Sequence, residues 1–240
     1  YNGNKERIYK VSMRALEQEN NQFRVPETDF EMPTGALVLK GRHNYFNMQC
    51  AVLAAKQLGV SNALIEKALT SFVNEPHRLE SVITMEELEF INDSKATNVD
   101  AVFYALEAMT KPVVWIVGGV DKGNDYTQLF DLVQKKVRAI VCLGVDNSRI
   151  QKAFEEQHEI IVEVRSVEEA IKVATLYGEP GDAVLLSPAC ASFDLFKNYV
   201  DRGNKFKAAL MHQHKMMTEG ILVTLNIDLT NNPVNRKSDN

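Results

Sequence analysis

The stretch E-L-E-F-I-N-D-S-K-A-T-N, Glu87 to Asn98, with the following V-D-A-V-F-Y-A-L-E-A-M, Val99 to Met109, decides the fold. Its first five residues are apolar enough for a strand, and its last eleven carry apolar residues at helical spacing. A strand that runs through a polar turn into a helix is typical of an open α/β sheet, in which ligands bind outside the carboxyl ends of the strands.

The polar turn between these elements, Asn92 to Asn98, contains more chemistry than a helix start requires. It holds a carboxylate, an ammonium, two hydroxyls and two amides. Ser, Thr, Asp and Asn are good N-caps, but capping explains one or two of these side chains rather than the whole set. We therefore interpret the turn as part of a ligand site.

The same alternation of strands and helices continues along the chain. The strands are continuous apolar runs, which indicates burial on both faces and covering layers of helices. The prediction is an α/β fold with a doubly wound, mostly parallel, Rossmann-like sheet. The further strands are expected at 112–118, 138–144 and 182–187, and the helices at 126–135, 148–155, 167–176 and 202–216.

The flanking sequence has a different character. Residues 1–38 read as polar connecting structure that Pro26 and Pro33 interrupt. Two short helices are expected at 47–58 and 61–72, as a pair that closes a domain. The last segment, 220–229, could form an edge strand before a polar tail.

Composition narrows the class of partner. The net charge of −5 and the pI near 5.6 argue against nucleic acid, which calls for a basic surface, and favour a small-molecule substrate. No apolar run approaches the roughly 20 residues that a membrane span needs. Cys50, Cys142 and Cys190 lie among apolar or small neighbours, which is typical of buried thiols in a reducing compartment and favours the cytoplasm.

Two further strand ends carry unusual residues. In G-G-V-D-K-G, Gly118 to Gly123, the glycines allow close approach to a ligand and Asp121 and Lys122 offer opposite charges beside it, although such a turn is often only structural. S-P-A-C-A-S-F-D, Ser187 to Asp194, suits a carboxylate or phosphate, or alternatively tight packing. Cys190 is given little weight as a nucleophile because no histidine or acid is placed near it.

These motifs resemble those of the Mur ligases, over the segment from Gly41 to Leu210. The patterns G-x-H-N-x-x-N and H-R are shared with the related folylpolyglutamate synthetases. The other motifs are similar to those of the D-glutamate-adding members of the family, namely N-D-S-K-A-T-N (92–98), G-G-x-D-K-G (118–123), S-P-A-C-A-S-F-D (187–194) and R-G-N-x-F (202–206).

The resemblance implies an ATP- and Mg²⁺-dependent ligase that adds D-glutamate to UDP-N-acetylmuramoyl-L-alanine through an acyl phosphate, in cytoplasmic peptidoglycan precursor synthesis. Residues 1–74 would be the end of the central ATP-binding domain, 75–216 the amino-acid-binding domain, and 217–240 an extra strand and tail. A phosphate loop, G-x-x-x-x-G-K-[ST], is absent from the 240 residues. We therefore expect this chain alone to be an inactive C-terminal fragment. We also expect the protein to be a monomer.

The family's functional positions carry over to three groups of residues, with no metal ligand among them. The resemblance assigns adenine to Asn44 and Asn47, the ribose and phosphates to His77, Arg78 and Asp93, and the reacting phosphate to Lys95. Arg78, Asp93 and Lys95 are the expected catalytic residues. D-Glutamate is assigned to Thr97, Lys122, Ser192, Phe193 and Tyr199, of which Phe193 and Tyr199 differ from the commoner Leu and Phe.

Three alternatives stay open at this point. The chain could belong to another amide ligase of the Mur or folylpolyglutamate type, or form a Rossmann-like binding module without catalysis. A nicotinamide-dependent oxidoreductase is suggested by fold alone, and the lack of G-x-G-x-x-G after a strand counts against it.

Overall fold

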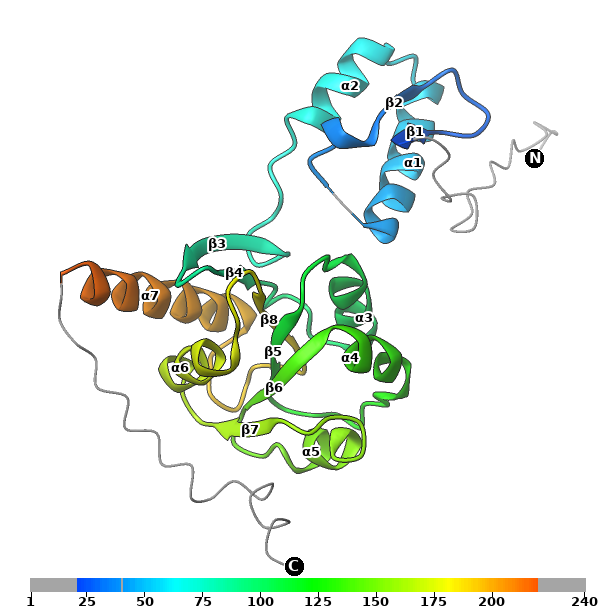
Figure 1. Ribbon diagram of the computed structural model, residues 1–240. Coiled ribbons are helices and arrows are strands. Elements are labelled where there is room, and N and C mark those ends of the chain that lie inside the picture. The colour runs from blue at the N-terminus through cyan, green and yellow to red at the C-terminus, as the bar shows by residue number, and fades with distance from the viewer. Residues whose placement is uncertain (1–20, 40, 220–240) are drawn as a thin grey trace, which may run out of the picture. The chain divides into compact units, whose positions relative to one another are not determined.

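The computed structural model describes residues 21–39 and 41–219, and the chain forms two compact units that divide between Asn74 and Glu75 (Figure 1). The edge strand expected at 220–229 lies outside the described residues. None of the helices in the described ranges has the length and hydropathy needed to cross a bilayer.

The N-terminal unit is a small hairpin packed with helices. Its elements are β1 (Gln22–Arg24), β2 (Glu31–Pro33), the 3₁₀ turn η3 (Thr34–Ala36), α1 (Arg42–Gln57) and α2 (Asn62–Thr70). Phe23 of β1 pairs with Met32 of β2, and both are buried with residues of the two helices such as Val52. The two helices are confirmed, whereas the prediction of connecting structure is wrong for the hairpin, whose three-residue strands are too short for an alternating pattern.

The C-terminal unit is built on one six-stranded sheet. Its strands are β3 (Glu80–Met85), β4 (Leu88–Asn92), β5 (Val113–Gly118), β6 (Val137–Leu143), β7 (Ile161–Val164) and β8 (Ala183–Ala189). Their order is β3-β4-β8-β5-β6-β7, with β3 antiparallel to β4 and every other pair parallel. The predicted doubly wound, mostly parallel sheet is confirmed.

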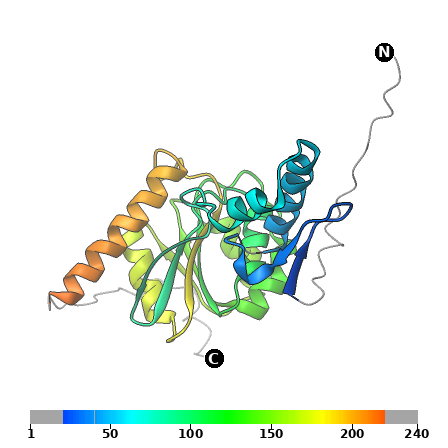
Figure 2. The same ribbon diagram turned by 90° about the horizontal axis from the view of Figure 1, so that it is seen from above.

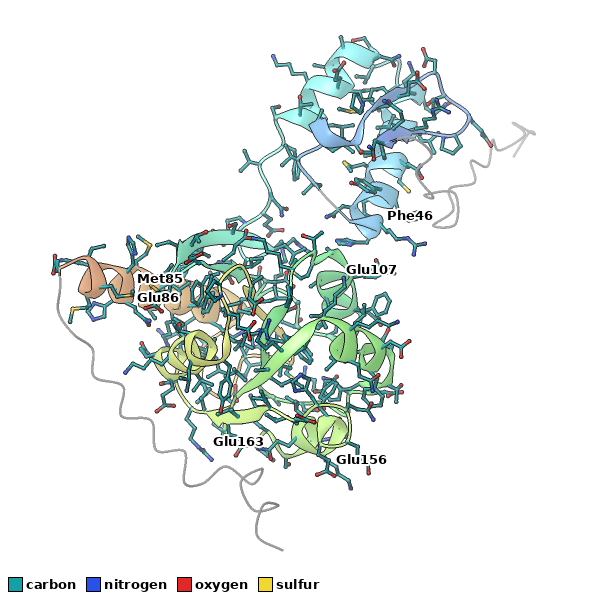
Figure 3. All side chains as sticks on the ribbon, viewed as in Figure 1. Phe46, Met85, Glu86, Glu107, Glu156 and Glu163 are labelled. Atoms are coloured by element: carbon teal, nitrogen blue, oxygen red, sulfur yellow. The ribbon has the colours of Figure 1, made fainter. Side chains whose placement is uncertain are left out.

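Strands β3 and β7, at the two edges of the sheet, were not expected from the sequence. A two-residue turn joins β3 to β4, and its residues Glu86 and Glu87 both have positive φ, 52° and 62°; Figure 3 marks Met85 and Glu86 at this turn. Such turns favour Asn and Gly, so two glutamates give no hairpin signal. Strand β7 has only four residues, which is too short for a clear pattern.

Helices cover both faces of the sheet. One face carries α3 (Val99–Ala108), α4 (Phe130–Lys136), which follows the 3₁₀ turn η4 (Thr127–Leu129), and α5 (Ser148–Phe154), around a core that includes Trp115 and Phe154. The other face carries α6 (Val167–Tyr177) and α7 (Tyr199–Thr218), around a core that includes Phe90 and Phe206. Figure 2 shows the end of α7 extending away from the sheet, where Met211 and Met217 are exposed.

The strand order brings the three polar turns of the sequence together, because β4, β8 and β5 are adjacent and parallel. The turns after β5 and β8 approach each other so closely that one position, Gly119, has no room for a side chain. A Cβ on Gly119, whose φ is +124°, would lie 2.2 Å from the carbonyl oxygen of Ala191. The glycine is thus required by the close approach of the turns after β5 and β8.

We predict that Gly119→Ala destabilises the chain by roughly 2–4 kcal/mol, because it adds a steric clash to a strained backbone. Gly181→Ala is the matched control, since φ there is +95° but no atom lies within 4 Å of the added Cβ. It should cost only about 1 kcal/mol. Urea unfolding followed by the fluorescence of Trp115, the single tryptophan, measures both. Equal losses would show that the two turns do not approach this closely.

Candidate functional site

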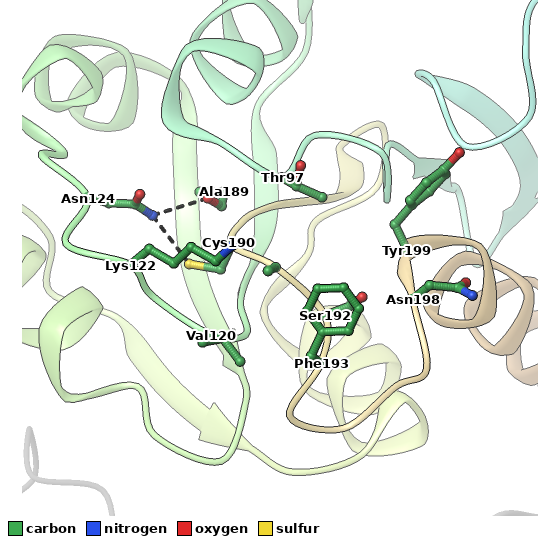
Figure 4. A pocket seen from close by; sticks show the side chains of 11 residues that line it. Thr97, Val120, Lys122, Asn124, Ala189, Cys190, Ser192, Phe193, Asn198 and Tyr199 are labelled. Carbon is green, nitrogen blue, oxygen red and sulfur yellow. Dashed lines mark hydrogen bonds between the residues drawn. The ribbon is translucent and has the colours of Figure 1, made fainter.

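A pocket of about 260 Å³ opens where the three turns and the start of α7 meet (Figure 4). This volume lies just below the range of about 300–1,000 Å³ that is usual for ligand sites, so the pocket suits a small ligand. It is lined by Thr97, Val120, Lys122, Asn124, Ala189, Cys190, Ala191, Ser192, Phe193, Asn198 and Tyr199. All five residues that the resemblance assigns to the amino-acid ligand are among them.

Lys122 is the cationic residue of this pocket lining. Its side chain extends along the pocket (Figure 4), and within the described residues neither an ion pair nor a hydrogen bond engages its ammonium. The hydroxyls of Thr97 and Ser192 lie in the same lining, and Phe193, 69% exposed, adds an apolar wall. The arrangement offers an uncompensated positive charge, hydroxyl donors and apolar surface to a small anion.

Arg202, in the first turn of α7, connects the three strand ends through hydrogen bonds from its buried guanidinium. It is 1% exposed, and its guanidinium donates to the Ser94 carbonyl at 2.9 Å, the Cys190 carbonyl at 3.3 Å and the Gly118 carbonyl at 3.4 Å. Ser94 and Cys190 follow β4 and β8, and Gly118 is the last residue of β5, so all three carbonyls lie at the carboxyl ends of these strands. Burial lowers the pKa of Arg202 to about 10, so the group still carries its charge at neutral pH.

A buried polar cluster joins the turns after β5 and β8. The Tyr126 hydroxyl donates to Asp121 at 2.8 Å and lies 3.4 Å from the sulfur of Cys190. The amide of Asn124 donates to the Ala189 carbonyl at 3.1 Å. Burial raises the pKa of Cys190 to about 11, so the thiol stays protonated and is a poor nucleophile.

Asp93 lies beneath the turn after β4 and is 6% exposed. It accepts hydrogen bonds from the Ser187 hydroxyl at 2.8 Å and the Leu79 amide at 3.2 Å. Burial raises its pKa to about 7, and the hydrogen bonds and the nearby Arg78 offset this only in part. The carboxyl is therefore held in the interior, with Arg78 on the side that faces solvent.

Lys95 and Arg78 project from neighbouring segments and share an acidic neighbour. Glu75 lies 2.6 Å from the Lys95 ammonium and 3.6 Å from the Arg78 guanidinium. The Lys95 ammonium also stands 5.6 Å from the centre of the Tyr199 ring, which lines the pocket. Lys95 thus lies beside the pocket, and Arg78 lies near it through the shared Glu75, so that the two cations form a group that could meet phosphate oxygens.

His77 is 4% exposed and serves the interior of the unit. Its Nδ1 accepts from the Asn92 amide at 2.9 Å, which places the ring proton on Nε2, and burial lowers its pKa. Gly203 allows this packing, since a Cβ there would lie 2.2 Å from Nδ1. His77 carries a positive φ of 67°, so the loop that presents Arg78 is strained.

The remaining nucleotide residues, Asn44 and Asn47, belong to the N-terminal unit. They lie three positions apart in the first turns of α1, and hence on one face of that helix. Cys50 on the same helix is exposed, which corrects the expectation of three buried thiols, while Cys142 and Cys190 are buried as expected.

Sequence reasoning did not assign roles to Asn124, Asn198 and Val120, which also line the pocket. It also placed the charge of Asp121 beside the ligand, whereas the carboxylate turns toward Tyr126 and only Lys122 lines the pocket. Val120, Lys122 and Asn124 belong to or follow the glycine-rich turn that the sequence singled out, so only the direction of their side chains was missing, whereas Asn198 lies at the N-cap of α7.

Residues 77–190 match the family model for the glutamate ligase domain of Mur ligases. UDP-N-acetylmuramoylalanine–D-glutamate ligase from Christiangramia forsetii is 49% identical over 81% of this chain and 44% of that protein. The enzyme of the same name from Cytophaga hutchinsonii is 46% identical over 83% of this chain and 44% of its own length. The chain therefore spans less than half of these curated relatives.

Solved structures show the same fold at low identity. UDP-N-acetylmuramate–alanine ligase from Thermotoga maritima gives a TM-score of 0.56 at 17% identity, over 77% of this chain and 40% of that one. Folylpolyglutamate synthase from Mycobacterium tuberculosis gives 0.53 at 14% identity, over 73% of this chain and 41% of that one. These likenesses establish the arrangement of the elements.

We predict that Asp93 makes the stability of the chain depend on pH. The folded carboxyl has a pKa of about 7, and the unfolded one about 3.9. The stability that protonated Asp93 contributes is fully present below about pH 4 and is lost as the pH rises to about 7, by up to roughly 4 kcal/mol. Asp93→Asn should abolish this loss.

Urea unfolding of both proteins at several pH values between 4 and 8 measures this effect. The free energy of unfolding of the variant, relative to that of the unsubstituted chain, should increase from pH 4 to 7 and then level off. A difference that is constant across this range would mean that Asp93 is already ionised at pH 4.

Proposed function

The chain belongs to the Mur ligase family, and on that premise we propose that its protein is the ATP-dependent ligase that joins D-glutamate to UDP-N-acetylmuramoyl-L-alanine. The observation that carries the proposal is the pocket with the unengaged Lys122 ammonium, lined also by the hydroxyls of Thr97 and Ser192. The names of the relatives support the same substrates.

D-Glutamate makes demands that this pocket fits. The molecule carries two carboxylates, which need charge-assisted hydrogen bonds, and a short chain of methylenes between them. Lys122 would hold one carboxylate, with Thr97 and Ser192 as further donors, and Phe193 would cover the methylenes. Tyr199 would close the side of the pocket that lies next to Lys95.

The cationic group beside the pocket would serve the nucleotide and the reacting centre. We assign Lys95 to the developing charge on the phosphate and acyl group, and Arg78, with Asp93 and His77 behind it, to the ribose and phosphates of ATP. Asn44 and Asn47 of the N-terminal unit would hold the adenine. Residues 1–74 would accordingly be the end of the ATP-binding domain and 75–216 the amino-acid-binding domain.

The proposed reaction has two steps. ATP transfers its terminal phosphoryl group to the carboxylate of the nucleotide-linked alanine, and the amine of D-glutamate then attacks the acyl phosphate and expels phosphate. Both steps depend on positioning and cationic stabilisation rather than on a protein nucleophile, which agrees with the protonated thiol of Cys190.

Magnesium would neutralise the phosphates in this reaction. Among residues 21–39 and 41–219, no three His, Cys, Asp or Glu side chains gather into a metal-binding group. We therefore assign no metal ligand within the described part of the chain. We further propose that the protein acts in the cytoplasm and is a monomer.

The function is tested by the amino acid that the full-length protein uses. With ATP and UDP-N-acetylmuramoyl-L-alanine present, phosphate release should depend on D-glutamate and be at least about 100-fold slower with D-alanine, which lacks the second carboxylate. Release with a diaminopimelate but not with D-glutamate would assign the chain to another branch of the family. Ligand binding without any phosphate release would favour a module without catalysis.

Lys122→Ala in the full-length protein should weaken the use of D-glutamate by roughly 10- to 100-fold, because a charge-assisted hydrogen bond contributes about 1.5–3 kcal/mol. The KM of UDP-N-acetylmuramoyl-L-alanine should barely change, and Lys122→Arg should rescue only in part. Lys111→Ala is the control, since Lys111 flanks the opposite end of β5 and pairs with Glu89 at 2.8 Å. Unaltered D-glutamate kinetics in Lys122→Ala would reduce Lys122 to a solvated turn residue.

A further inference from the structure

We propose that Asp121 is a positioning residue for Lys122: its carboxylate organises the turn that carries the lysine and keeps its own negative charge away from the lysine ammonium. The inference rests on the proposed function, in which Lys122 binds a carboxylate of the substrate. It concerns a residue that does not line the pocket and would not touch the substrate.

The carboxylate of Asp121 accepts three hydrogen bonds within its own turn, and the exposed guanidinium of Arg149 in α5 lies 4.0 Å from its Oδ1. Oδ1 accepts hydrogen bonds from the backbone N–H groups of Gly123 at 2.7 Å and Asn124 at 2.9 Å. Oδ2 accepts one from the Tyr126 hydroxyl at 2.8 Å. Its side chain is only 6% exposed. Although burial opposes ionisation, the hydrogen bonds from Asn124, Tyr126 and Gly123 hold the pKa of Asp121 below its ordinary value.

Tyr126 connects this turn to the rigid part of the sheet. It is 3% exposed, and its ring packs 5.6 Å from the ring of Phe154 in the core. The backbone N–H of Asn124 donates to Asp121, and the side-chain amide of Asn124 donates to the Ala189 carbonyl at the end of β8. Both sides of the turn are therefore fixed to buried elements.

The turn separates two opposite charges that are adjacent in the sequence. Asp121 and its donors Gly123 and Tyr126 do not line the pocket, whereas Lys122 lines it and extends along it (Figure 4). A lysine on a loose turn would lose more conformational freedom when it binds a ligand, and could pair with the neighbouring carboxylate instead. The hydrogen bonds of Asp121 prevent both.

The test measures D-glutamate kinetics in variants of the full-length protein. Asp121→Ala should raise the KM of D-glutamate about 10-fold or more, with kcat and the KM of ATP within about 2-fold of the unsubstituted protein. Tyr126→Phe, which removes one of the three hydrogen bonds and keeps the ring packing, should raise it about 3-fold. Asp121→Asn, which retains an acceptor for the two amides, should recover most of the loss in Asp121→Ala.

Asp146→Ala is the matched control. The exposed Asp146 forms the same kind of turn after β6, where its Oδ1 accepts from the Ser148 amide at 3.0 Å, and this turn does not line the pocket. Its removal should leave the KM of D-glutamate within about 2-fold. A similar increase in both variants would attribute the effect of Asp121 to general loosening and overturn the proposal.

A double-substitution cycle separates the inference from the function on which it rests. If Asp121 acts through Lys122, adding Asp121→Ala to Lys122→Ala should raise the KM of D-glutamate no further, whereas additive effects would overturn the inference.

The single variants distinguish the inference from the proposed function. If Lys122→Ala raises the KM but Asp121→Ala and Tyr126→Phe do not, the inference fails and the proposed function stands. If Lys122→Ala has no effect, the assigned role of Lys122 fails, and the inference with it. Should Asp121→Ala not fold, Tyr126→Phe takes its place in the cycle.

Discussion

The buried guanidinium of Arg202 is the interaction on which the site depends. It donates to carbonyls at the carboxyl ends of three strands, β4, β5 and β8, and to the Ser94 hydroxyl at 3.0 Å. A buried charge is costly unless its donors are satisfied, so these turns are held where their carbonyls can meet it. The Ser94 hydroxyl in turn donates to the Tyr199 carbonyl at 2.8 Å, which fixes the start of α7 as the fourth wall of the pocket.

This clamp explains why the pocket can leave a cation unengaged. Arg202 occupies the Ser94, Cys190 and Gly118 carbonyls. The Asp121 carboxylate is engaged by donors of its own turn and does not pair with the Lys122 ammonium. The glycines where the strands end allow the backbones to approach, because a Cβ on Gly118 would lie 2.4 Å from the Leu143 carbonyl oxygen. Contacts of the backbone thus make the site rigid, and a few side chains, such as Lys122, stay available to bind a ligand.

On the side next to the proposed nucleotide site, the charges are arranged differently. Asp93 is held in the interior with a raised pKa, while Arg78 and Lys95 face outward beside Glu75. The buried ring of His77 accepts a hydrogen bond from the Asn92 side chain, which stabilises this loop. Residues that a motif places side by side therefore divide into an inner group, which shapes the loop, and an outer group, which can meet a ligand.

The sequence by itself determined the fold class and the strands buried on both faces, because continuous apolar runs and helical spacing are local signals. It also singled out the three polar turns. It could not reveal β3 and β7, whose turn residues and length are atypical, nor the β1–β2 hairpin. Only the tertiary structure decided that Lys122 lines the pocket while Asp121 turns inward, and that one arginine of α7 joins three turns far apart in sequence. Side-chain direction and long-range hydrogen bonds depend on which elements become neighbours, and no local pattern encodes that.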